Sequence, residues 1–445
     1  MNEKKGSFIG LLPMIIFLIV YFAFGIGTGE FDASFPLMMG ITLASIISLL
    51  IESPAVEKKK TFAEKAIDFC KGGGDDTLIL MVLIFLLAGA FYKISIETGA
   101  RDVIGRIGVA LLPPRFILPA IFIIGMVFSF AMGTSMGTVN AVMVFATGFA
   151  ETLNVPMPLI CGVVVGGAMF GDNLSFISDT TIAATTTQEV PMKAKFQQNI
   201  LMCLPAVIIT LIALCFVPIT VPEATTLPAI NEMLCVVPFI LIIILALAGV
   251  HVLISMTLSV AVGAVIGVIQ GNFPLFNTAE AAGVFAQIHE GMTWMEDIGV
   301  IAILIGGVCA MMHYLGGIQW LMNTLAGSVK SSKGCELALA ALAFLVDIAT
   351  TNNTVTIIAI GPIAKELADK FGVARERVAS ILDIFASVGQ GISPHGGQLL
   401  TAGRLAGISP AAMIPFCWYP ILMGVSSLVF ILLGIANPTH KKVAA

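Results

Sequence analysis

The sequence predicts an all-α polytopic membrane protein built from two inverted repeats, each with five transmembrane helices, a re-entrant helical hairpin and one broken helix. Three observations predict this class. The 445 residues are 58% hydrophobic and only 11% charged, whereas soluble domains are about 25% charged. The apolar residues gather in segments of bilayer length. Polar landmarks in the first half of the chain recur in the same order in the second half.

Ten apolar segments are expected to span the bilayer, because a helix of about 20 residues crosses its hydrocarbon core. These segments are 8–28, 33–52, 76–98, 157–189, 197–219, 233–250, 252–271, 297–315, 376–402 and 412–435. The first of them is longer than the apolar core of a signal peptide, so it is expected to remain as the first helix. Segments 157–189 and 376–402 are interrupted by polar runs, which predicts two broken helices.

The distribution of cations predicts the orientation. With the N-terminus inside and ten crossings, 17 of the 22 Lys and Arg fall in cytoplasmic segments, Lys195 and Arg377 among them. The expected outer loops 220–232 and 272–296 contain Glu but no Lys or Arg. This bias follows the positive-inside rule. It predicts a multi-pass protein of the cytoplasmic membrane with both termini in the cytoplasm, and there is no basic face for nucleic acid.

An internal repeat divides the chain into residues 1–220 and 221–445. The polar run 171–176 matches 389–394 at an offset of 218 residues, and 133–139 matches 349–355 at an offset of 216. Five crossings in each half make the second copy inverted, an arrangement common in secondary transporters.

Two further segments, 115–150 and 336–372, run apolar, polar, apolar, and are predicted to be the re-entrant hairpins. Non-helical backbone at membrane depth is tolerated only where it is buried in protein or lines a cavity. The two hairpin tips are therefore expected to meet near the midplane.

Polar residues at these breaks and tips predict an ion-binding site, because carboxylate, hydroxyl and unwound carbonyl oxygens are ligands for Na⁺. In the first broken helix they are Asp172, Asn173, Ser175, Ser178, Asp179 and Thr180. The hairpin tips contribute Thr134, Ser135, Thr138, Thr351, Asn352, Asn353 and Thr354. The second broken helix contributes Gln390, Ser393, His395 and Gln398, and Asp347 and Asp383 are secondary candidates.

Asp172 and Asp179 are two helical turns apart, so both can face one cavity. Sodium is expected there and at the hairpin tips, and H⁺ and Na⁺ would compete for the same carboxylates. The alternative for the polar runs is a helix-packing seam. For Asp347 and Asp383 the alternative is a helix cap or an interhelical hydrogen bond, and for His395 it is a structural hydrogen bond.

The run Gly171-Asp-Asn-Leu-Ser-Phe-Ile-Ser-Asp-Thr-Thr181 resembles the signature of the NhaC-type sodium/proton antiporter family, Gly-Asp-Lys-x-Ser-Pro-x-Ser-Asp-Thr-Thr. That family belongs to the ion transporter superfamily. Asn173 stands where the signature has Lys, and Phe176 where it has Pro, so the break is expected to depend on Gly171 and the hydroxyl run. The resemblance implies Na⁺/H⁺ exchange, relatives that exchange organic anions or amino acids, and a homodimer.

The sequence therefore predicts a secondary active Na⁺/H⁺ antiporter and not an enzyme. No catalytic residue, nucleotide motif or cofactor is expected, and Na⁺ and H⁺ are the coupled ions. The alternative is a Na⁺-coupled transporter or exchanger of a small organic acid or amino acid. In that case His395, Gln398, Asn352 and Asn353 would bind the solute.

Overall fold

The computed structural model describes residues 5–29, 31, 35–219 and 228–435, and the regular elements in these ranges are helices. The first half contains α1 (Leu12–Thr28), α2 (Leu37–Leu50), α3 (Phe62–Gly73), α4 (Asp76–Glu97), α5 (Ala100–Leu111), α6 (Ile117–Met132), α7 (Ser135–Leu153), α8 (Met157–Leu174), α9 (Asp179–Gln188) and α10 (Met192–Cys215). The second half contains α11 (Val237–Leu247), α12 (Val252–Gln270), α13 (Val284–Trp294), α14 (Glu296–Tyr314), α15 (Gly317–Gly327), α16 (Ser332–Thr350), α17 (Asn353–Phe371), α18 (Arg375–Ile392), α19 (Gly397–Ala406), α20 (Pro410–Met413) and α21 (Trp418–Leu433). Short 3-10 helices are η1 (Phe8–Leu11), η2 (Pro114–Phe116), η3 (Glu232–Val236) and η4 (Ile414–Phe416).

Seven helices in the described residues are long and apolar enough to cross a membrane, or eight if one bent pair is counted as a single span. The bent pair is Arg375–Ala406 followed by Pro410–Phe416, with an angle of 100° between its parts. The protein is therefore a helical polytopic membrane protein, as predicted. Three of the ten predicted spans are shorter apolar helices, namely Leu37–Leu50, Glu232–Leu247 and Trp418–Leu433.

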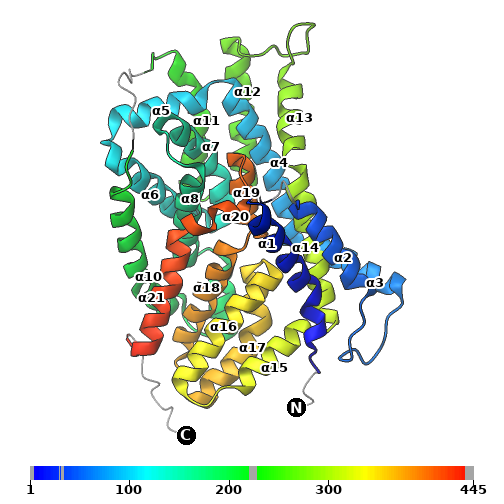
Figure 1. The fold of residues 1–445 in the computed structure, drawn as a ribbon. Helices are drawn as coiled ribbons and strands as arrows, with labels where there is room; N and C mark the ends of the chain where they lie inside the picture. The colour runs from blue at the N-terminus through cyan, green and yellow to red at the C-terminus, as the bar shows by residue number, and fades with distance from the viewer. Residues whose placement is uncertain (1–4, 30, 32–34, 220–227, 436–445) are drawn as a thin grey trace.

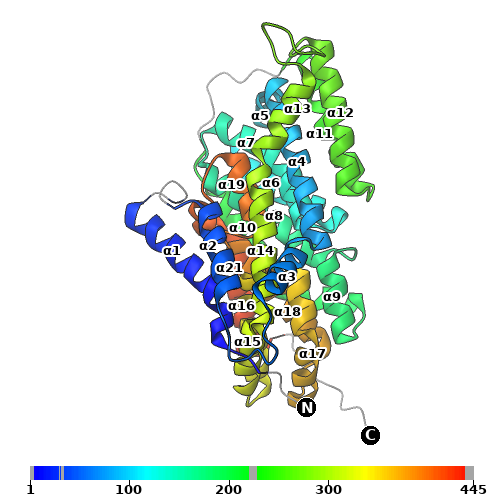
Figure 2. The ribbon, with the colours of Figure 1, turned by 90° about the vertical axis from the view of Figure 1, so that its right-hand side faces the viewer.

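The prediction of an outer loop over residues 272–296 is wrong for most of its second half, because α13 occupies Val284–Trp294. This helix packs along α4 (Figure 2). Gly291 and Gly89 lie at the contact, where an added Cβ on Gly89 would be 2.0 Å from the Gly291 carbonyl oxygen. The predicted cytoplasmic termini, and residues 220–227 of the other expected outer loop, fall outside the described residues.

The helix bounds of the two halves recur at a constant spacing. Helices α7, α8 and α9 begin at residues 135, 157 and 179, and α17, α18 and α19 begin at 353, 375 and 397, each 218 residues later. Left-handed backbone follows the same rule, since Gly133 and Thr351 both have a positive φ. The predicted offset of 216 at the hairpin tips is therefore wrong by two residues. Figure 1 shows α6 and α7 in the upper part of the molecule and α16 and α17 in the lower part.

The broken helices run through α8 and α18, most of whose residues are buried. Helix α8 packs closely on α6 through glycines. A Cβ on Gly171 would lie 2.3 Å from the Met126 carbonyl oxygen. Gly171 is helical, and α8 continues to Leu174. The expectation that Gly171 causes the break is therefore wrong, because this glycine permits the close approach of α6.

We expect Gly167→Ala to destabilise the protein. Its Cβ would lie 2.4 Å from the Phe122 carbonyl oxygen of α6, and overpacking of this kind costs about 1–3 kcal/mol. The control is Gly27→Ala in α1, where nothing lies within 4 Å of the added Cβ and helix propensity favours Ala. Thermal unfolding in detergent checks the pair. Equal melting temperatures for the two variants would contradict the close α6–α8 packing.

Candidate functional site

Two interhelical tips are formed by the same local chemistry. After α6, Gly133 takes a left-handed conformation and the Thr134 hydroxyl accepts a hydrogen bond from the Gly137 N–H, capping α7. After α16, Thr351 is left-handed and the Asn352 side chain accepts from the Val355 N–H, capping α17. Thr and Asn are favoured N-cap residues. Each tip therefore ends one helix and begins the next within a few residues.

The two breaks use side chains to satisfy backbone groups. Between α8 and α9, the Ser175 hydroxyl donates to the Phe130 carbonyl oxygen at 2.7 Å. Between α18 and α19, the His395 Nε2 lies 2.9 Å from the Ile348 carbonyl oxygen. Phe130 and Ile348 occupy the last turns of α6 and α16, where carbonyls lack helical partners. Each break thus supports the adjacent tip.

A cavity of about 410 Å³ lies between the tips and the broken helices. Eleven of the predicted residues line it, namely Thr134, Ser135, Asp172, Asp179, Thr180, Thr351, Asn352, Asn353, Thr354, Gln390 and Gln398. Eight do not, namely Thr138, Asn173, Ser175, Ser178, Ser393, His395, Asp347 and Asp383. Helix α4 contributes Thr77, Leu80, Met81 and Ile84. His251, the N-cap of α12, also lines the cavity and was not among the predicted residues.

Asp172 is the buried carboxylate of this cavity, with 5% of its surface exposed. One of its oxygens accepts the Ser135 hydroxyl and the other the Ser178 hydroxyl, both at 2.7 Å. The Gln398 amide in turn donates to the Ser135 hydroxyl at 3.0 Å. These groups come from the first tip, the first break and α19, so the hydrogen bonds around Asp172 connect three separate segments.

Asp179 lines the same cavity but is exposed. Its carboxylate accepts the Thr354 hydroxyl of the second tip at 2.8 Å. Within the described part of the chain, neither Asp172 nor Asp179 has an ion pair with a basic residue. Carboxylate and hydroxyl oxygens without a basic partner can bind a proton or a hard cation such as Na⁺.

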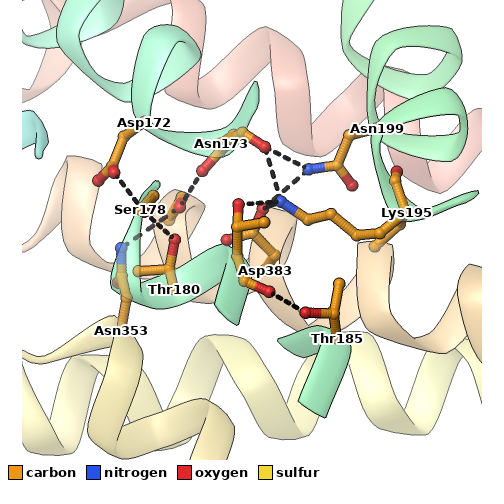
Figure 3. A network of polar contacts seen from close by, with 12 residues as sticks. Asp172, Asn173, Ser178, Thr180, Thr185, Lys195, Asn199, Asn353 and Asp383 are labelled. Atoms are coloured by element: carbon orange, nitrogen blue, oxygen red, sulfur yellow. Dashed lines mark hydrogen bonds and ion pairs between the residues drawn. The ribbon is translucent and has the colours of Figure 1, made fainter. Parts of the chain in front are cut away.

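Asp383 lies outside the cavity in a buried ion pair. Its carboxylate is 2.7 Å from the Lys195 ammonium, and it accepts the Asn199 amide at 2.8 Å (Figure 3). Both charged side chains are essentially inaccessible. The assignment of Lys195 to a cytoplasmic segment is therefore wrong, because Lys195 points into the bundle from α10. Lys195 and Asn199 are four residues apart at the start of an apolar helix, so they lie on one face of it. This spacing is the sequence signal that could have indicated a buried polar partner for Lys195.

Arg377 was also assigned to a cytoplasmic segment and is fully buried. It pairs with Glu336 of α16 at 3.1 Å, and both side chains are almost inaccessible.

Asp347 is fully buried too, and one of its carboxylate oxygens has no hydrogen-bond partner within the described residues. The hydroxyls of Thr138 and Ser393 bond to carbonyls four residues earlier in the chain, so they are turned away from the cavity.

Interrupted helices that surround a polar, acid-lined cavity are the arrangement of secondary transporters. The chain belongs to the Na⁺/H⁺ antiporter family, whose model matches residues 7–219 and 193–437. This result confirms the resemblance read from residues 171–181.

Three similar proteins have been named by function. The Malate-2H(+)/Na(+)-lactate antiporter of Bacillus subtilis (strain 168) is 24% identical over 80% of this chain and 79% of its own length. The Na(+)/H(+) antiporter NhaC of the same organism is 22% identical over 98% of this chain and 99% of its own length. The Arginine/ornithine antiporter ArcD of Halobacterium salinarum is 22% identical over 98% of this chain and 93% of its own length.

We expect His395→Gln to leave the pH profile of transport unchanged. The Nε2 atom donates to a backbone carbonyl and the ring packs edge-on against Phe17, and a Gln amide can replace that donor. The measurement is sodium-dependent proton movement in proteoliposomes across pH, with exposed His289→Gln as the control. Loss of a titration step in His395→Gln alone would place the imidazole in the transport site instead.

Proposed function

We propose that this protein is a secondary active Na⁺/H⁺ antiporter of the cytoplasmic membrane, in which Asp172 and Asp179 bind Na⁺ and H⁺ alternately. The observation that carries the proposal is the buried Asp172 carboxylate, which faces a polar cavity without a basic partner in the described chain. A carboxylate in such a place needs a compensating cation. Family membership supports the same function.

The proposed exchange needs no chemistry beyond ligand exchange at oxygen atoms. When Na⁺ binds, the Asp172 carboxylate and the Ser135 and Ser178 hydroxyl oxygens are available as hard ligands. When Na⁺ leaves, those hydroxyls can donate to the carboxylate, as they do at 2.7 Å. A proton on Asp172 competes with Na⁺ for the same atoms. Only one of the two cations is then carried at a time.

We further propose that the two halves are inverted repeats, residues 1–220 and 221–445, with α6–α7 and α16–α17 as re-entrant hairpins. The constant spacing of 218 residues between helix bounds supports a repeat. The opposite placement of the two helix pairs in Figure 1 supports its inversion. Inverted repeats provide alternating access to a fixed midplane site. The same proposal places both termini in the cytoplasm and includes a homodimer.

Asp172→Asn and Asp179→Asn are each expected to lower Na⁺-dependent proton movement in proteoliposomes by at least about tenfold. Loss of a charged ligand that contributes more than about 1.4 kcal/mol weakens binding by that factor. Asn is similar in size to Asp, so the folded protein is expected to persist. The readout is the pH change inside the vesicles after addition of NaCl.

Asp102→Asn is the matched control, because Asp102 is an exposed residue of α5 that does not line the cavity. This variant should exchange ions at the wild-type rate. Wild-type sodium dependence in Asp179→Asn would show that Asp179 is not a transport ligand. No Na⁺-dependent pH change in the wild type, under either gradient, would remove the proposed function.

A second function is favoured by the size and lining of the cavity. About 410 Å³ exceeds what one Na⁺ needs, and the lining includes amides that can hydrogen-bond a solute, from Asn352, Asn353 and Gln398. Similar proteins are named for exchange of malate and lactate or of arginine and ornithine. The alternative is therefore a Na⁺-coupled exchanger of a small organic acid or amino acid. His395, the fourth residue predicted to bind the solute, does not line the cavity.

Thermal stabilisation distinguishes the two functions. An antiporter of Na⁺ and H⁺ alone is expected to be stabilised by NaCl and unaffected by malate, lactate, arginine or ornithine. A Na⁺-coupled carrier that binds Na⁺ and the solute together should show reciprocal stabilisation, because linkage makes the effect of each ligand on the binding of the other mutual. The measurement is the melting temperature over a grid of NaCl and solute concentrations. Stabilisation by a solute that does not depend on NaCl would contradict coupling.

A further inference from the structure

The ammonium of Lys195 lies in a shell of oxygen atoms at the broken end of α8. Its Nζ is 2.7 Å from the Asp383 carboxylate, 2.7 Å from the Asn173 backbone carbonyl and 2.7 Å from the Thr181 hydroxyl. Lys195 is 1% exposed and Asp383 is 0% exposed. None of these residues lines the cavity that contains Asp172. The shell is thus a second buried polar centre, visible in Figure 3.

The backbone break creates the negative side of this shell. The Asn173 carbonyl lies in the last turn of α8, where carbonyls have no helical partner. The N–H of Ile177, four residues later, bonds to the Ser175 hydroxyl instead. The open carbonyl therefore accepts from Lys195 and also from the Asn199 amide at 2.9 Å. The negative end of the α8 dipole adds to the attraction for a cation.

The chemistry of the shell is that of a sodium site. A carboxylate, a hydroxyl and an unwound helix carbonyl are the ligands that coordinate Na⁺ at broken helices of transporters. The shell also contains an acceptor that Lys195 leaves unused. Within the described residues, Oδ1 of Asp383 is buried without a hydrogen-bond partner. The centre therefore has more oxygen acceptors than its donors satisfy.

We propose that the Lys195 ammonium is a built-in cation that occupies a sodium-type site, separate from the transport site at Asp172. Lys195 is a positioning residue in this arrangement: it holds the end of α8, and with it the residue next to Asp172, without a bound ion. The break then keeps its shape when the cavity releases Na⁺. This inference goes beyond the proposed exchange and does not depend on it.

The test is whether Na⁺ replaces the ammonium when the lysine is removed. Lys195→Ala removes the positive charge and leaves the space of the side chain vacant, so an ion can enter. Lys195→Met fills the space without a charge. Both changes are made in an Asp172→Asn/Asp179→Asn parent, which removes the carboxylates of the cavity. The melting temperature is measured in NaCl and in N-methyl-D-glucamine chloride at constant ionic strength.

We expect the Ala variant to melt below the parent in N-methyl-D-glucamine chloride, because Asp383 is left buried and unpaired. Its melting temperature should rise saturably with NaCl. The Met variant should melt low in both salts. Adding Asp383→Asn to the Ala variant should abolish the sodium response. Recovery of folded Ala variant only when NaCl is present during purification would support the proposal equally.

Three results would overturn the inference: an Ala variant with no sodium response beyond that of the parent, a Met variant with the same response as the Ala variant, or an Ala variant that is misfolded in both salts. The response is the difference between variant and parent. A sodium response that persists in the parent itself counts against the proposed roles of Asp172 and Asp179. The two proposals therefore fail separately.

Discussion

Every backbone N–H and C=O at membrane depth must find a partner inside the protein, because the hydrocarbon core offers none. Both broken helices and both tips leave such groups open, and side chains from neighbouring segments satisfy them. Ser175 and His395 bond carbonyls in the last turns of α6 and α16. Lys195 and Asn199 bond the carbonyl at the end of α8. These bonds satisfy carbonyl groups that the irregular backbone around the cavity would otherwise leave unpaired.

One face of α18 connects these supports. Ser380, Asp383 and Ser387 are spaced three and four residues apart, so they lie on the same side of the helix. They bond the Lys195 carbonyl, the Lys195 ammonium and the Asn173 side chain, respectively. The Asn353 side-chain amide of the second tip also lies 3.3 Å from the Ser387 hydroxyl. The break in the first half and the tip in the second half are thereby joined through one helix, which gives a contiguous physical route for coupling between them.

The sequence was sufficient to predict where the helix is interrupted, because polar residues inside apolar segments are costly in lipid and are kept for a reason. It could not predict which polar residues face the cavity. Ser175 and His395 support carbonyls that become open only once the tips have folded. Lys195 follows a short polar segment before an apolar helix, a pattern typical of a cytoplasmic anchor. Only the packing of α10 against α18 buries it beside Asp383.

Charge balance in the buried centre indicates which carboxylate responds to ions. Asp383 is neutralised by Lys195, and Glu336 by Arg377, so neither pair needs an external cation. Asp172 and Asp347 are buried and have no ion pair with a basic residue in the described ranges. Only Asp172 of these two lines the cavity. Asp172 is therefore the buried carboxylate that lines the cavity without a basic partner in the described ranges, and the exposed Asp179 lines the same cavity, which is the arrangement that the proposed exchange requires.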